Sequence, residues 1–176
     1  RTASGDYLRQ DDVRLAVPSA LAGAFPDPAA APWPYAFVAV PTADVTTEPP
    51  PRSRRIQVPV AQRLPRYTRV NVEEEGERWV RVGEGRYLRR DEVRRFRPHE
   101  RPEGVGSTER WFDVDLTEQI FSVWDGDVPR FVTLASTGKG NTTREGSFRI
   151  WRAAAVQSMA GLPAADGGKE YDVRDV

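Results

Sequence analysis

The chain has 176 residues, enough for one or two domains with a buried core, and its 26 basic and 26 acidic side chains sum to zero net charge. Balanced charge argues against a nucleic-acid partner, which normally requires a basic excess on one face. Cysteine is absent and His99 is the single histidine, so the sequence offers no thiol nucleophile, no disulfide and no thiolate or His-pair metal site. The longest apolar stretch, 35–40, is too short to span a bilayer.

The first eighteen residues resemble a later segment of the same chain. Residues 5–14 match residues 85–94 at seven of ten positions, and Pro18 and Pro98 then fall in register. Self-similarity at a fixed offset is typical of a duplicated structural unit. We interpret residues 1–18 as the tail of an earlier copy and expect the parent protein to extend beyond this chain. Residues 19–34 are expected to form an Ala/Pro-rich linker.

Residues 35–98 contain short alternating segments joined by polar turns. We predict strands over 35–40, 69–73, 79–82 and 85–89, a charged turn over 74–77, a one-turn helix over 91–93 and an exposed proline-rich loop within 43–56. Short strands at close spacing indicate a small antiparallel barrel. The proline-rich loop could act as a PxxP-type ligand, although a solvated loop is the simpler interpretation.

One motif in this region resembles a known domain. Trp79 and Val82 form a Trp-x-x-Val motif that is followed by a glycine, an aromatic residue and a run ending in valine. This pattern resembles the bacterial SH3-like (SH3b) domain. The resemblance implies an SH3-like barrel over 35–98, followed by a polar linker over 99–107.

The last segment predicts an antiparallel meander. Its strands are expected over 110–116, 119–124, 130–136 and 146–151, with a hairpin turn over 125–127 and a polar Gly-rich loop before the fourth strand. Alternation in the first strand places Phe112, Val114 and Leu116 on one face, which we expect to be buried. Asp113 and Asp115 then lie on the solvated face.

The motifs of this meander resemble the opening of the L,D-transpeptidase (YkuD-type) catalytic domain. They are, in order, 113–116, 119–121, 125–127, 136–138 and 143–150, and Arg144 stands where the family usually has proline. The resemblance implies that 108–176 is the N-terminal part of an incomplete β-sandwich-like catalytic domain. It also implies a periplasmic or cell-envelope protein that acts on peptidoglycan peptide stems by cysteine acyl transfer. The family's Cys/His motif lies C-terminal to the matched region, so no catalytic residue carries over and we expect this chain alone to be inactive.

Other patterns have simpler interpretations than the functions they suggest. Residues 136–143 resemble a phosphate loop, but Lys139 is followed by glycine, and no nucleotide site is expected. Asp113 and Asp115 could form a carboxylate pair for glycoside hydrolysis, although a solvated face is the commoner role. The tryptophans could form a sugar-binding stripe, although core packing is more usual. These tryptophans are Trp79, Trp111, Trp124 and Trp151.

Two hypotheses about function remain. In the first, the chain is a fragment of an L,D-transpeptidase with SH3-like repeats that target the cell wall. In the second, it belongs to a non-catalytic cell-wall-binding or structural envelope protein built of the same β modules. Both hypotheses have peptidoglycan as the partner, and both predict no catalytic residue, cofactor or metal site within this chain.

Overall fold

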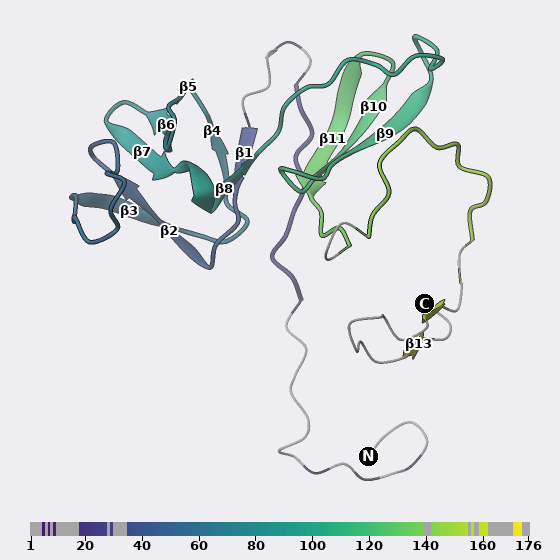
Figure 1. Ribbon diagram of the computed structural model, residues 1–176, viewed down its shortest axis with the longest axis horizontal. Helices are drawn as coiled ribbons and strands as arrows, with labels where there is room; N and C mark the ends of the chain where they lie inside the picture. Colours follow the sequence, from purple (N-terminus) through teal and green to yellow (C-terminus); the bar gives the residue numbers. More distant parts are fainter. Residues whose placement is uncertain are drawn as a thin grey trace. The chain divides into compact units, whose positions relative to one another are not determined.

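The structure is a computed structural model that describes residues 5, 7, 9, 18–27, 29, 35–138, 142–154, 156, 159–161 and 171–173. The chain divides into two compact units, residues 1–143 and 144–176. The described residues form antiparallel sheets and include no α-helix (Figure 1). The mainly-β class predicted from the sequence is therefore confirmed.

Two sheets occupy the region 35–95 of the first unit. The five-stranded sheet has the order β3-β2-β7-β6-β5, and the three-stranded sheet has the order β4-β1-β8. The strands are β1 (Tyr35–Val38), β2 (Thr42–Thr46), β3 (Val60–Pro65), β4 (Arg69–Asn71), β5 (Glu74–Glu75), β6 (Trp79–Gly83), β7 (Arg86–Arg89) and β8 (Val93–Arg95). Side chains from both sheets pack into one apolar cluster, which comprises Ala36, Val38, Ala43, Val45, Val72, Val80, Leu88 and Val93.

The predicted strands at 35–40, 79–82 and 85–89 are confirmed as β1, β6 and β7, and the predicted strand at 69–73 begins as β4. The predicted one-turn helix is the 3-10 turn η3 (Arg90–Glu92), one residue earlier than expected.

The loop predicted within 43–56 is present from 47 onward but wrong at its start, and the predicted turn over 74–77 is wrong at its first two residues. β2 occupies the start of the segment expected to be a loop, because Ala43 and Val45 on one face of the strand enter the core while Thr46 pairs with Tyr87 of β7. Glu74 and Glu75 form β5 rather than a turn. Arg81 lies opposite Glu74 in the ladder and donates to its carboxylate at 3.1 Å, which offsets the poor strand propensity of glutamate.

The second half of the first unit is the expected meander. β9 (Arg110–Asp115), β10 (Ile120–Asp125) and β11 (Val128–Leu134) pair in the order β11-β10-β9 and confirm the first three predicted strands (Figure 1). The fourth predicted strand is wrong: residues 146–151 form no strand, and Phe148 and Trp151 are exposed. An extended segment becomes a strand only where a neighbouring strand accepts its hydrogen bonds, and the described residues give this one no such partner. The second unit contains instead the pair β12 (Met159–Gly161) and β13 (Tyr171–Val173).

The predicted faces of β9 are inverted. Phe112 and Val114 are 47% and 42% exposed, whereas Trp111 is buried and the side chains of Asp113 and Asp115 are only 22% and 16% exposed. Trp111 stacks on Trp124 with ring centroids 5.2 Å apart, and its Nε1 donates to the Gly126 carbonyl at 2.7 Å. A tryptophan buries more apolar area than phenylalanine or valine, so it decides which face of the strand turns inward and carries the two aspartates with it.

One strand joins the two halves of the first unit. All four residues of β1 are buried: Ala36 and Val38 face the first cluster, while Tyr35 and Phe37 enter a second. The second cluster consists of Ala24, Tyr35, Phe37, Phe96, Trp111, Ile120, Trp124 and Val132. The regions 35–98 and 108–134 therefore share a core, and the described residues of 99–107 run between them without a strand.

Part of the segment 19–34 also contributes to this core. Ala24 is buried and forms an isolated bridge with Val132 of β11, with N–H to carbonyl distances of 2.7 and 2.9 Å. The predicted similarity between residues 5–14 and 85–94 stays a prediction, because most of the first segment lies outside the described residues.

Replacing Gly126 by alanine should destabilise the first unit strongly. Gly126 has φ +55°, and an added Cβ would overlap the carbonyl of Ser107. Gly104 is the matched control: it has φ +80° but no atom within 4 Å of an added Cβ. In urea unfolding we expect Gly104→Ala to cost about 1–2 kcal/mol for the left-handed backbone alone, and Gly126→Ala to cost more. Equal losses for both variants would contradict the close packing of this turn.

Candidate functional site

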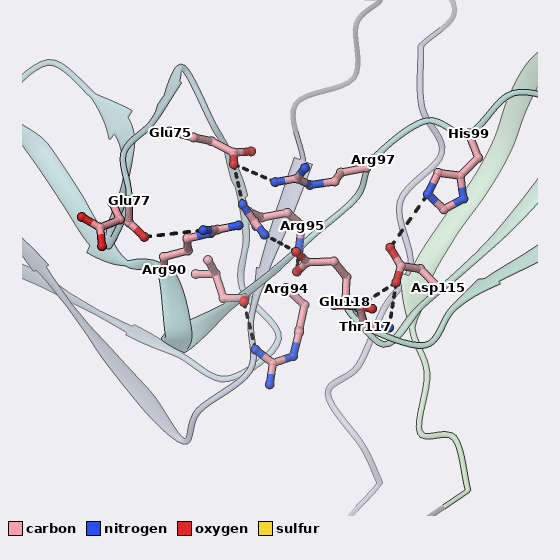
Figure 2. Close-up of polar contacts among 11 residues, drawn as sticks. Glu75, Glu77, Arg90, Arg94, Arg95, Arg97, His99, Asp115, Thr117 and Glu118 are labelled. Carbon is pink, nitrogen blue, oxygen red and sulfur yellow. Dashed lines mark hydrogen bonds and ion pairs between the residues drawn. The ribbon is translucent and has the colours of Figure 1, made fainter. Parts of the chain in front are cut away.

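A buried arginine lies at the junction of the two halves of the first unit. Arg95 ends β8, its side chain is 7% exposed, and its guanidinium pairs with Glu75 and Glu118 (Figure 2). The backbone N–H of Arg95 also donates to Glu118 Oε2 at 3.0 Å. Arg97 donates to Glu75 at 3.0 Å, so this carboxylate serves two guanidinium groups. Buried charges persist only where partners of opposite charge and hydrogen bonds replace water, and this network supplies both.

Local chain geometry holds Glu118 in place. Asp115 Oδ1 accepts hydrogen bonds from the backbone N–H groups of Thr117 and Glu118, at 2.8 and 2.9 Å (Figure 2). This turn follows β9, and Gln119 completes it with a left-handed backbone at φ 54°. The side chain of Glu118 is thereby directed at β8. One hydrogen-bonding position of Arg95 stays open, because its buried Nε has no partner among the described residues.

A pocket of about 410 Å³ lies beside Arg95. Its lining includes seven arginines and three acidic residues, so it is strongly basic although the whole chain is neutral. Three of the arginines are matched by carboxylates. Arg54 pairs with Asp91 and Glu92, both at 2.7 Å, and these hydrogen bonds raise its pKa; Arg78 pairs with Glu77 at 3.7 Å, and Arg95 is paired as described.

The other four arginines of the pocket have no carboxylate partner among the described residues. These are Arg52, Arg89, Arg90 and Arg94. Arg89, Arg90 and Arg94 each donate to a backbone carbonyl, namely those of Pro51 at 3.0 Å, Glu77 at 3.5 Å and Val93 at 3.1 Å. A guanidinium has five N–H donors, so most of their hydrogen-bonding capacity remains free. The pocket can therefore accept an anion.

The proline-rich loop forms one wall of this pocket. The Pro51 carbonyl accepts from Arg89 of β7, and Arg54 is held by η3, so the loop is attached to the rest of the first unit at both points. A PxxP ligand must present its prolines and basic residue to a partner. These internal contacts favour a structural role for the loop over a ligand role.

His99 has partners that the sequence does not reveal. Its Nδ1 lies 3.0 Å from Asp113 Oδ2 and its Nε2 lies 4.0 Å from Asp115 Oδ2. Burial raises the pKa of the Asp113 carboxyl, and the neighbouring imidazole partly opposes this shift. The two aspartates thus form a histidine-linked cluster on the inward face of β9 rather than a solvated pair.

Ser122, the hydroxyl residue paired with Asp113 in the ladder, is not available to this cluster as a nucleophile. Both imidazole nitrogens of His99 face carboxylates. Ser122 is fully buried and accepts a hydrogen bond from Trp124 Nε1 at 2.8 Å. An acyl-transfer site needs a nucleophile that is accessible and close to a base. The part of the chain that the structure describes also contains no group of three side chains placed to hold a metal ion.

The tryptophans of the first unit form no common stripe, because Trp111 and Trp124 stack in the core and Trp79 packs edge-on against Tyr87. Trp151 is exposed in the second unit. In the segment that resembles a phosphate loop, Lys139 lies outside the described residues.

Comparison of the chain with models of protein families, with curated proteins and with solved structures finds no match. Within the described ranges, the structure has no helix with the length and apolar character needed to cross a membrane.

Asp113 and Asp125 should respond to pH in opposite directions. The raised pKa of Asp113 means that its contribution to stability is complete below pH 3.8 and is lost as the pH rises through the folded-state pKa. Arg110 lowers the pKa of Asp125, whose contribution is present above pH 3.8 and is lost as the pH falls through the folded-state pKa. Relative to the parent chain, Asp113→Asn should therefore gain stability between acidic and neutral pH, and Asp125→Asn should lose it. Thermal unfolding from pH 3 to 7 measures both differences, and shifts of the same sign would contradict the burial of Asp113.

Proposed function

We propose that the chain is the wall-binding part of a bacterial cell-envelope L,D-transpeptidase. In this proposal, residues 35–98 are an SH3-like barrel and residues 108–176 are the N-terminal part of a β-sandwich-like catalytic domain in the periplasm or cell envelope. The order of motifs in the meander supports it, because the segments that resemble the family lie on β9, on β10 and in the turn at Gly126. The residues that carry out cysteine acyl transfer would belong to another part of the parent protein.

The observation that supports a binding role for this chain is the pairing of its single histidine, His99, with two carboxylates. His99 is held between Asp113 and Asp115, and the nearby hydroxyl of Ser122 is buried against Trp124. Because its hydroxyl is buried, Ser122 is not available to this base as a nucleophile. The described residues do supply a basic pocket, which suits recognition of the wall.

Two measurements on the 176-residue chain test this proposal. The chain should co-sediment with purified peptidoglycan sacculi, and it should leave a tetrapeptide-stem muropeptide unchanged in mass spectrometry. Cross-linked or trimmed muropeptide would contradict the binding role. Failure to co-sediment would contradict peptidoglycan as the partner.

The alternative is a non-catalytic wall-binding or structural envelope protein built of the same modules. The pairing of His99 with Asp113 also favours this alternative, because binding to the wall requires no catalytic residue. The parent gene separates the two hypotheses. An L,D-transpeptidase requires a histidine followed by a Ser-His-Gly-Cys-type motif downstream, and activity that is lost when that cysteine is replaced.

A further inference from the structure

We infer that the arginine-lined pocket beside Arg95 binds a peptide that carries at least two carboxylates. The inference deepens the proposed function by assigning recognition to the peptide part of the wall, and it rests on the proposed function only for the source of that peptide. The pocket itself is defined by its side chains and by the contacts that leave them unmatched.

The first argument is charge. Arg52, Arg89, Arg90 and Arg94 converge on one pocket without a carboxylate partner among the described residues. Arg89, Arg90 and Arg94 are half-buried, and like charges held together in partly desolvated positions repel one another. A single carboxylate would leave most of this charge unbalanced. A ligand with two or more carboxylates would balance it through charge-assisted hydrogen bonds.

The second argument is preorganisation. Three of the four guanidinium groups are oriented by a backbone carbonyl, and the loop that carries Arg52 is anchored by the ion pairs of Arg54 with η3. Side chains that are already oriented lose less conformational entropy when a ligand binds.

The third argument distinguishes a peptide from a polyphosphate. Glu77, Asp91 and Glu118 also line the pocket, and the side chains of Glu77 and Asp91 are 82% and 68% exposed. Each of these carboxylates is paired with an arginine, and the exposed ones, Glu77 and Asp91, keep acceptor positions for N–H donors, which a polyphosphate lacks. They suit a ligand that alternates carboxylates with N–H donors, as a peptide with acidic side chains and amide or amino groups does.

The test uses the full chain and isothermal titration with four probes. These are the isolated tetrapeptide stem of peptidoglycan, the same stem with its carboxyls amidated, the dipeptide Glu-Glu, and inorganic tripolyphosphate. We expect the stem to bind, amidation to weaken binding at least tenfold, and added NaCl to weaken it further because the contacts are ionic. Equal affinity of the two stems when both bind, or tighter binding of tripolyphosphate than of any peptide, would overturn the inference.

Matched variants locate the binding. Arg89→Gln/Arg90→Gln removes two pocket charges, one from β7 and one from η3, whereas Arg63→Gln/Arg86→Gln removes two charges from β3 and β7 outside the pocket. The pocket variant should lose at least tenfold in affinity for the stem, and the control variant should bind as the parent chain does. Arg52 is exposed on a loop, so Arg52→Gln should leave the fold intact and weaken binding of the stem severalfold. This variant tests the pocket if the double variant does not fold. Unchanged affinity in the folded pocket variants would overturn the inference.

The outcome also separates this inference from the proposed function. If the chain co-sediments with sacculi and the pocket variants do so equally well, the wall is the partner but the pocket inference is wrong. If the chain binds neither sacculi nor the stem but binds Glu-Glu through the pocket, the inference holds and the proposed function is wrong.

Discussion

Replacing Arg95 by methionine is expected to lower the free energy of unfolding by about 3–5 kcal/mol, because it leaves the buried carboxylate of Glu118 without its cation. The Arg95 and Glu118 side chains are 7% and 11% exposed, so water cannot replace the lost partner efficiently. Glu75 is more exposed, at 38%, and retains Arg97 as a second partner. The loss should therefore come mainly from Glu118. Urea unfolding at neutral pH, followed by circular dichroism, measures it.

Arg63→Met is the matched control for this substitution. Arg63 pairs with Asp44 at 3.1 Å between two exposed side chains of β3 and β2. Exposed ion pairs contribute about 0–1 kcal/mol, so this variant should stay close to the parent chain. The double variant Arg95→Met/Glu118→Met removes both buried charges and should recover a large part of the lost stability. An Arg95→Met variant that costs no more than Arg63→Met would contradict the buried network.

Trp124→Ala should cost about 3–5 kcal/mol, as large-to-small substitutions of buried tryptophan do. Trp124 is 2% exposed, stacks on Trp111, and lies 5.9 Å from the ring of Phe96. Phe96 follows β8 and shares its cluster with Tyr35 and Phe37 of β1. The cavity should therefore weaken both halves of the first unit at once.

Hydrogen exchange tests this coupling. Amides of β6 and β7, which lie in the other core cluster, should lose protection in Trp124→Ala together with amides of β10. Trp79→Ala is the control, because Trp79 is only half-buried on β6 and packs on Tyr87 of β7, outside the core cluster that contains Trp124. Unchanged protection of β6 and β7 in Trp124→Ala would show that the two halves unfold independently.

Local patterns were sufficient to predict three of the four expected meander strands, but not the face that β9 buries. In β9 the period of two is correct, whereas the buried face is the one that carries Trp111 and not Phe112. Alternation alone gives the period of a strand. Which face turns inward depends on the partner across the sheet, here Trp124, and this contact is not local.

The strand β2 was not predicted, because its proline-rich neighbours indicated a loop and its pairing partners are distant in sequence. Thr42–Thr46 is a short segment, and its place in the core depends on pairing with β3 and with β7, about forty residues later in the sequence. Composition suggested a loop because prolines and charges follow immediately. Long-range pairing outweighed that local signal.

The candidate site depends even more on long-range contacts. A net charge of zero hides the local excess, because folding brings Arg52 and Arg78 beside the segment 89–95, so that seven arginines and only three acidic residues line the pocket. The one sequence signal is the pair of Arg-Arg dipeptides at 89–90 and 94–95. The partners of His99 lie fourteen and sixteen residues away on β9, and spacing alone does not indicate which residues of that strand they are.

The most direct test of the central claim, that this chain binds peptidoglycan peptide stems without modifying them, is an NMR titration of the labelled chain with the soluble tetrapeptide-stem muropeptide. We predict amide shifts that saturate and cluster at 52–54, 89–95 and 117–118, with the muropeptide signals unchanged in number. Absence of saturable shifts, shifts confined to other parts of the chain, or new product signals would contradict the account.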